Sequence, residues 1–362
     1  MPDPRVVKMA GVIAGYSLAL RPGDLVLVQS EPPGFPLVRE FYRAALAAGA
    51  NPYFRAEWPE LVAIRLNEGS DEQLGFVSGI SRLEVEQVNA RLVIRAPQNL
   101  AATAGCRPDR QALAARAARP LFERLMERRA AGELRTCLTQ FPTDASAQQA
   151  GMSLEGYEEF VFRACLLHED DPVAAWQRVS RDQQRHVDLL DRVSGLRFEA
   201  PGTDIRMSVK GRKWINSDGK ANFPSGEVFS APVEDSVEGR VRFDVPCPYK
   251  GRAVEGVELE FRAGKVVAAK AERGDEFLQA QLDTDEGSRT LGEVAFGLNY
   301  SIDRPTGNIL FDEKLGGTIH LALGAGYPDS GSRNKSAIHW DLIRTMTPGR
   351  VSADGKTIYE DG

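Results

Sequence analysis

The hydrophobic pattern of the first half alternates between short apolar runs and longer segments with helical spacing. Residues 24–30 form an apolar run after a Pro-Gly turn, which predicts a buried strand. Residues 35–48 carry apolar side chains at helical spacing, and Gly49 follows at the position of a C-cap. Residues 51–55 and 92–96 predict further strands. Strand–helix–strand units of this length favour a parallel sheet with helical crossovers.

The middle of the chain is predicted to be helical. Residues 153–167 form an amphipathic segment with Ser153 at its N-cap, and residues 172–190 form another with proline in the first turn. The Arg-rich run at 107–129 is interrupted by acids, which is typical of a solvated helix face. These segments close an N-terminal α/β domain that we assign to residues 1–190.

From residue 196 onward the pattern is mainly that of strands separated by turns. The predicted strands are residues 205–209, 240–245, 252–261, 265–271 and 320–323, with a short helix at 278–282. The fold class is therefore α/β, with an N-terminal α/β domain that contains a parallel sheet. A strand-rich α+β catalytic domain at residues 191–362 completes the chain.

Composition narrows the functional classes. The 362 residues are 42% apolar with a net charge of −6, and no basic stripe indicates nucleic-acid binding. The longest early apolar stretch, 12–20, is far too short to span a membrane. No G-x-G-x-x-G pattern follows the first strand, which argues against a nicotinamide cofactor. The four cysteines are widely spaced and predict reduced, mostly buried thiols in a cytoplasmic protein.

The candidate chemistry lies in the last third of the chain. Two of the four histidines fall within residues 320–341. Imidazole and carboxylate are ligands that zinc, cobalt and manganese share. Three carboxylates with two imidazoles exceed the needs of one zinc ion and suit two ions that share a carboxylate. The candidate ligands are Glu227, Glu293, His320, His339 and Asp341.

The spacing of His339 and Asp341 supports this hypothesis. Side chains at i and i+2 of a strand point to the same face, so one strand can present both residues to one metal, while Trp340 turns into the packing. Either histidine alone is better explained as an ordinary hydrogen-bonded strand residue, but the coincidence of five residues favours ligands. With ordinary imidazole pKa values, metal affinity is expected to fall below roughly pH 6.

Several sequence blocks occur in the order found in a known family. The blocks are residues 224–229, 291–294, 317–324, 326–328 and 336–341, with 23–28, 139–143 and 150–153 in the first domain. The chain resembles the aminopeptidase T / aminopeptidase S family over nearly its whole length. Members of this family are two-metal exopeptidases of bacteria and archaea.

The resemblance implies roles for individual residues. Glu293 would bridge the two metals or contact the reactive water, and Tyr327 falls on the family's catalytic tyrosine. Ser225 departs from the pattern, because many members carry an acid there. The implied cofactors are two divalent ions, from among zinc, cobalt, manganese and magnesium. The implied ligands are Glu227, Glu293, His320, His339 and Asp341.

The predicted function is a metal-dependent aminopeptidase of broad specificity that acts on peptides with a free N-terminus. The resemblance also implies a homodimer, in which the first domain shapes an internal cavity and supports the dimer. Whether Glu293 or Glu227 acts as general base stays open. Two alternatives are a metal-dependent amidohydrolase of acylated amino acids or small amides, and a peptide- or metal-binding protein whose catalysis has decayed.

Overall fold

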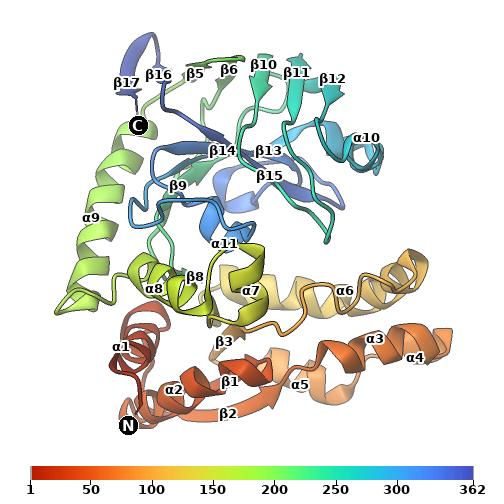
Figure 1. Cartoon of the computed structure of the whole chain (residues 1–362), viewed down its shortest axis with the longest axis vertical. Helices are drawn as coiled ribbons and strands as arrows, with labels where there is room; N and C mark the ends of the chain where they lie inside the picture. The colour runs from red at the N-terminus through yellow and green to blue at the C-terminus, as the bar shows by residue number, and fades with distance from the viewer. Residues whose placement is uncertain (1, 362) are drawn as a thin grey trace. The chain divides into compact units, whose positions relative to one another are not determined.

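The computed structural model describes residues 2–361 and divides into two compact units (Figure 1). One unit contains residues 1–173 with 219–223, and the other contains 174–218 with 224–362. The main division thus falls at Val173, whereas the sequence placed it at residue 190. Helix α9 (Pro172–Leu190) groups almost entirely with the C-terminal unit.

The N-terminal unit is built on a five-stranded parallel sheet in the order β2-β1-β3-β4-β8, as the alternating pattern predicted. Its first strands form where buried apolar runs were expected. The elements of this unit are α1 (Pro4–Val12), η1 (Ile13–Ser17), β1 (Leu25–Ser30), η2 (Pro32–Gly34), α2 (Phe35–Ala47), β2 (Asn51–Ala56), α3 (Pro59–Glu68), α4 (Asp71–Gly75), α5 (Gly79–Gln87), β3 (Ala90–Arg95), α6 (Pro108–Ala130), β4 (Arg135–Gln140), α7 (Asp144–Gln149), α8 (Leu154–Ala164) and β8 (Asn222–Phe223).

Local signals fix several helix ends. The Ser153 side chain accepts a hydrogen bond from the Gly156 amide, so α8 begins at the predicted cap. Gly49 has a φ of +77°, a conformation that glycine adopts without strain, and it ends α2 as expected. Helix α6 is mostly exposed, as its mixed charge predicted, although Arg128 is buried.

The C-terminal unit combines two antiparallel sheets. The first has the order β12-β11-β10-β6-β5-β16-β17 and the second the order β15-β14-β13-β9-β7. The elements are β5 (Gly195–Ala200), β6 (Thr203–Ser208), β7 (Ile215–Ser217), β9 (Glu227–Ser230), β10 (Glu238–Arg242), β11 (Glu258–Arg262), β12 (Lys265–Lys270), α10 (Asp275–Leu282), η3 (Glu286–Arg289), β13 (Leu291–Gly297), α11 (Ile309–Asp312), β14 (Thr318–Gly324), η4 (Pro328–Ser330), β15 (His339–Thr345), β16 (Arg350–Ala353) and β17 (Lys356–Glu360).

The two sheets share one hydrophobic core. Phe198 on β5 lies 5.9 Å from Phe296 on β13, measured between ring centroids, and Trp214 lies 5.8 Å from the same ring. The strand predicted at 252–261 is wrong in its first half, because β11 begins only at Glu258. Residues 252–257 form turns and isolated bridges instead, which place Val254 and Val257 in the core.

The central strands β13 and β14 are buried at every position. One face of their sheet packs into the shared core, so the other face holds the polar side chains away from solvent. Across residues 2–361, no helix combines the length and apolar character needed to cross a membrane. All four cysteines are buried free thiols, as expected.

Candidate metal centre

Strand pairing brings the five predicted ligands to one face of the β15-β14-β13-β9-β7 sheet. Directly paired residues share a face, and so do residues two apart on one strand. Ala322 on β14 pairs with Glu293 on β13 and with Asp341 on β15. By the same alternation His320, His339 and Glu227 (paired through Gly297) lie on that face.

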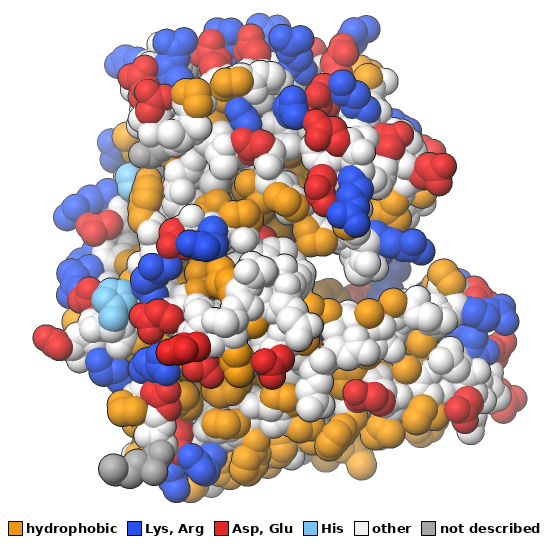
Figure 2. Space-filling view, viewed as in Figure 1, with side chains coloured by type: hydrophobic (Ala, Val, Ile, Leu, Met, Phe, Trp, Pro, Cys, Tyr) orange, Lys and Arg blue, Asp and Glu red, His pale blue; other side chains and the backbone are white. Residues whose placement is uncertain are grey.

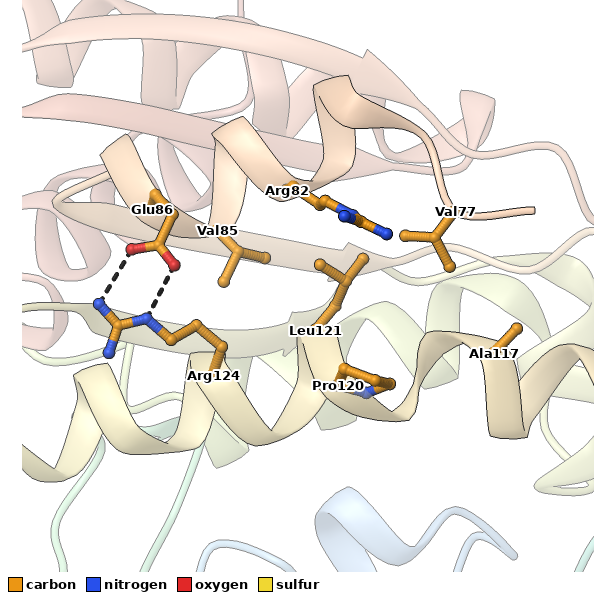
Figure 3. Close-up of a pocket in the computed structure, with 8 residues that line it drawn as sticks. All are labelled: Val77, Arg82, Val85, Glu86, Ala117, Pro120, Leu121 and Arg124. Carbon is orange, nitrogen blue, oxygen red and sulfur yellow. Dashed lines mark hydrogen bonds and ion pairs between the residues drawn. The ribbon is translucent and has the colours of Figure 1, made fainter. Parts of the chain in front are cut away.

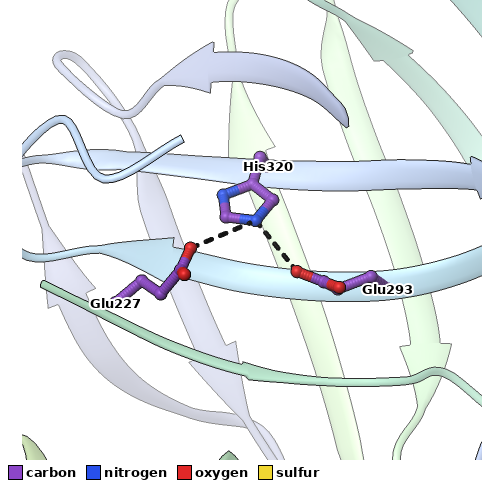
Figure 4. A group of neighbouring side chains, drawn as sticks. All are labelled: Glu227, Glu293 and His320. Atoms are coloured by element: carbon purple, nitrogen blue, oxygen red, sulfur yellow. Dashed lines mark hydrogen bonds and ion pairs between the residues drawn. The ribbon is translucent and has the colours of Figure 1, made fainter. Parts of the chain in front are cut away.

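The side chains meet in two overlapping groups around Glu293. The Nε2 atom of His320 lies 3.1 Å from Glu293 Oε1 and 3.6 Å from Glu227 Oε2 (Figure 4). The Nε2 atom of His339 lies 3.8 Å from Glu293 Oε2 and 3.5 Å from Asp341 Oδ1. Glu293 therefore presents one carboxylate oxygen to each imidazole.

The cluster is deeply buried, yet several of its polar atoms have no hydrogen-bond partner among the described residues. These atoms are Glu227 Oε2, Glu293 Oε2, His320 Nδ1 and Asp341 Oδ1. Leaving a buried polar atom unpaired costs about 1–3 kcal/mol, and more if it is charged. Atoms of this kind that converge within ligand distance suit divalent cations, so the donor set fits the implied metals.

A hydrogen bond orients the more open histidine. His339 Nδ1 lies 2.7 Å from the carbonyl oxygen of Ala325, to which it donates. A ligating histidine whose other nitrogen donates to a carbonyl is held in one tautomer. The Nε2 atom of His339 is thereby directed at Glu293 and Asp341.

Electrostatics in the metal-free cluster favour charged imidazoles. Burial alone would lower the pKa of His320, but the hydrogen bond to Glu293 and the charge of Glu227 outweigh it and raise the pKa to about 9. Burial is likewise outweighed at His339, where Asp341 and Glu293 raise the pKa to about 10. Burial alone would raise the pKa of the Asp341 carboxyl group, but the charge of His339 outweighs this effect and lowers the pKa to about 2. The protons thus occupy places that cations would take.

Two residues that the sequence analysis missed complete the cluster. Lys314 is fully buried, with Nζ 3.5 Å from Glu227 Oε1 and in contact with the Glu313 carboxylate. Glu313, together with His320 and Asp341, forms a third group within ligand distance. The signal was a Glu-Lys pair just before the Gly-Gly turn that leads into β14.

Tyr327 lies over the open side of the cluster. Its ring centroid is 5.4 Å from that of His339 and 5.5 Å from that of Phe229. Burial around the hydroxyl and the negative charge of Glu293 and Asp341 raise the pKa of Tyr327 well above its usual range. The phenol therefore keeps its proton at any physiological pH.

Ser225, where an acid was expected, is fully buried and serves the backbone. Its hydroxyl donates to the carbonyl of Ser217 at 2.8 Å and lies 2.7 Å from the Ser217 hydroxyl. These bonds fix the turn before Glu227, and the substitution leaves the candidate ligand in place.

The N-terminal unit contains a separate cavity (Figure 3). Its volume is about 330 Å³, and it lies between α5 and α6. Glu86 and Arg124 at its edge neutralise each other through a hydrogen bond of 2.8 Å. The side chains that line it include neither histidine nor cysteine, so this cavity offers no cluster comparable to the metal centre.

Known proteins resemble this chain in sequence and in fold. The chain is 31% identical to Aminopeptidase 2 of Geobacillus stearothermophilus, in an alignment that covers 96% of this chain and 94% of that protein. It is 34% identical to Aminopeptidase T of Thermus thermophilus over 56% of this chain and 55% of that one. A solved structure, wild-type AmpT from Thermus thermophilus, superposes with a TM-score of 0.85 at 26% identity, covering 99% of this chain and 98% of that one.

The model of one protein family matches residues 3–362. That match spans both units and all of the candidate ligands. The chain therefore belongs to the thermophilic metalloprotease (M29) family.

Proposed function

We propose that this protein is a metal-dependent aminopeptidase that releases N-terminal residues from peptides with the help of two divalent ions. The observation that carries the proposal is Glu293, whose two oxygens face two different imidazoles. A relative that aligns over 96% of this chain is named Aminopeptidase 2, which supports the substrate class.

The residues divide naturally between two ions. Glu227, His320 and one oxygen of Glu293 would hold the first, while His339, Asp341 and the other oxygen of Glu293 would hold the second. Glu313 supplies a further carboxylate next to His320 and Asp341. When bound, a pair of divalent cations lowers the pKa of water and polarises a carbonyl group.

The chain supplies the remaining chemistry. Glu293 and Glu227 are buried, and burial raises the pKa of both carboxyl groups, so either can accept a proton from water and return it to the leaving amine. Tyr327 keeps its proton and can donate a hydrogen bond to the oxygen on which charge develops. The positive charge of Lys314 balances the negative charges of Glu227 and Glu313, with which it forms ion pairs.

The ligand types suit zinc, cobalt and manganese, and magnesium is a fourth candidate. Restoring a chelated sample with each ion identifies which of them support turnover. Imidazole ligands disfavour magnesium, which prefers oxygen.

Assembly and location form part of the same proposal. We expect a cytoplasmic protein, because four buried free thiols suit a reducing compartment. We also expect a homodimer, in which the N-terminal unit supports the dimer and shapes the cavity. Hydrophobic side chains gather on that unit, along its lower edge in Figure 2. Its exposed apolar residues include Leu61, Phe76, Ile80 and Phe122.

The decisive experiment compares a leucine chromogenic amide with its N-acetylated twin, with and without chelator. Cleavage of the free amine alone, abolished by chelator and restored by metal, supports the aminopeptidase. Cleavage of the acetylated twin would instead support an amidohydrolase. Full metal content without turnover of any peptide would indicate a binding protein.

A further inference from the structure

A small cavity adjoins the metal centre within the C-terminal unit. Its volume is about 90 Å³, and His339 and Asp341 contribute to its wall. The other side chains that matter here are Pro246, Pro248, Tyr249, Ile309 and Ile343. Two candidate ligands therefore belong both to the cluster and to this cavity.

The cavity lies along the open edge of the sheet. Strand β15 is the last strand, and only β14 pairs with it. The hydrogen bond from Ala325 N to Ile338 O (2.8 Å) sets the alternation of main-chain groups along β15. His339, Asp341 and Ile343 consequently turn their main-chain groups away from β14, toward the cavity.

The segment 245–249 covers part of this edge and leaves a gap at Asp341. Val245 N donates to Ile343 O at 3.4 Å, and the main chain of His339 forms a hydrogen bond with Tyr249. The main chain of Asp341 lies between these two contacts. An extended peptide can approach the edge there, as in strand addition to a sheet.

Contacts of the lining residues with one another and with the neighbouring loop hold the walls in place. The ring of Tyr249 stacks on Trp340 at 5.0 Å, and Trp340 Nε1 donates to Cys247 O at 3.2 Å. On the opposite side, Asp312 accepts hydrogen bonds from the amides of Thr306 and Gly307 at 2.7 and 2.8 Å, which fixes the loop before Ile309. A cavity with such walls has a definite size.

Size and polarity together restrict the occupant. An apolar cavity of about 150 Å³ accommodates benzene, so a cavity of about 90 Å³ favours groups smaller than an aromatic ring. Proline, isoleucine and tyrosine side chains supply apolar parts of the wall, and His339 and Asp341 supply a polar end. The Asp312 carboxylate is engaged by the loop, and burial raises the pKa of the Cys247 thiol to about 12, so neither offers a free charge.

We propose that this cavity receives the side chain of the substrate's N-terminal residue and selects aliphatic side chains of up to four carbons over aromatic ones. The assignment rests on the proposed aminopeptidase function. Because the cavity holds a single side chain and adjoins the metal ligands, it fits the terminal residue better than the continuing chain. Ile309, which is 45% exposed on the short helix α11, sets its width.

The test uses two dipeptide series, X-Ala and Ala-X, with X as valine, leucine or phenylalanine, and the metal-loaded enzyme. We expect the wild type to favour Leu-Ala over Phe-Ala in kcat/KM by at least about tenfold. Ile309→Ala should lower the ratio of kcat/KM for Leu-Ala to kcat/KM for Phe-Ala. Ile309→Trp should lower kcat/KM for Leu-Ala more than for the other dipeptides. Calorimetric binding of free leucine and phenylalanine should change in parallel. Ile358→Ala, at a 37% exposed site on β17, is the matched control.

Two results would contradict the assignment of this cavity to the terminal side chain and leave the proposed aminopeptidase function intact. One is a preference among the X-Ala dipeptides that stays the same in both Ile309 variants. The other is an effect of these variants confined to Ala-X, which would place the second residue in the cavity. No cleavage of any dipeptide by the wild type would overturn both the assignment and the proposed function.

Discussion

The two ends of the metal centre differ in their access to solvent. His320 is fully buried beside Glu227 and the Lys314–Glu313 pair, whereas the His339 side chain is 30% exposed beside Tyr327. The buried end is suited to retaining an ion, because the charged groups around it balance one another. The open end adjoins the small cavity and is built for meeting substrate. We therefore propose that one sheet face carries two candidate ion sites with different tasks.

The largest expected effect comes from removing one imidazole at a time. His320→Ala and His339→Ala should each lower kcat by more than about a thousandfold, since a divalent ion supplies several kcal/mol of stabilisation. Metal analysis should separate the ends: His339→Ala should retain one ion through dialysis. His186→Ala, at an exposed position on α9, is the control. Equal metal content in both variants would remove the distinction between the ends.

The next effect concerns Lys314. Lys314→Met leaves Glu227 and Glu313 as uncompensated buried carboxylates, so the free energy of unfolding should fall by about 3–5 kcal/mol in chelator. Metal should restore much of this loss. Urea denaturation measures it, with Lys356→Met, at an exposed site on β17, as control. An unchanged denaturation midpoint in chelator would show that Lys314 does not balance the buried end.

At the open end, Tyr327→Phe removes only a hydroxyl. On the proposed mechanism kcat should fall by about a hundred- to a thousandfold, with metal content unchanged. Tyr300→Phe, at a 62% exposed position, should have no effect. Full activity of Tyr327→Phe would reduce this tyrosine to a packing partner of His339.

The last expected effect is a dependence of stability and metal affinity on pH. With pKa values of about 9 and 10, both imidazoles are charged at neutral pH in the metal-free protein. Their contribution to the stability of that form is complete below about pH 6.5 and is lost as pH rises through 9 and 10. Metal binding has the opposite sign, because it requires neutral imidazoles.

Metal affinity should therefore keep rising between about pH 7 and 9, by about tenfold per pH unit for each proton released. This pH range lies above the range near pH 6 that is expected for imidazoles with ordinary pKa values. Calorimetry in buffers of different ionisation enthalpy counts the released protons. Metal binding without proton release at pH 7 would contradict the raised pKa values.

Much of the fold was predictable because its signals are local. The apolar run that became β1, the serine that caps α8 and the glycine after α2 act through neighbours in the sequence. The predicted strand at 252–261 failed over its first half. There, isolated bridges and burial in the core decide the backbone, and neither is visible in a pattern of residues.

The candidate site was predictable in its members but incomplete. Ligand chemistry and the two-residue spacing of His339 and Asp341 identified one part, and the family resemblance joined it to Glu227 and Glu293. Lys314 and Glu313 were missed, since a charged pair before a turn usually lies in solvent.

The sequence by itself determined the types of the candidate ligands, the strands that carry His320, His339 and Asp341, and the family. The tertiary structure alone decided that five side chains from four strands share one face, and that Lys314 is buried beneath them. It also decided that a small cavity opens beside β15. The physical reason is that register and burial arise from contacts between residues far apart in the chain, whereas ligand chemistry belongs to each residue alone.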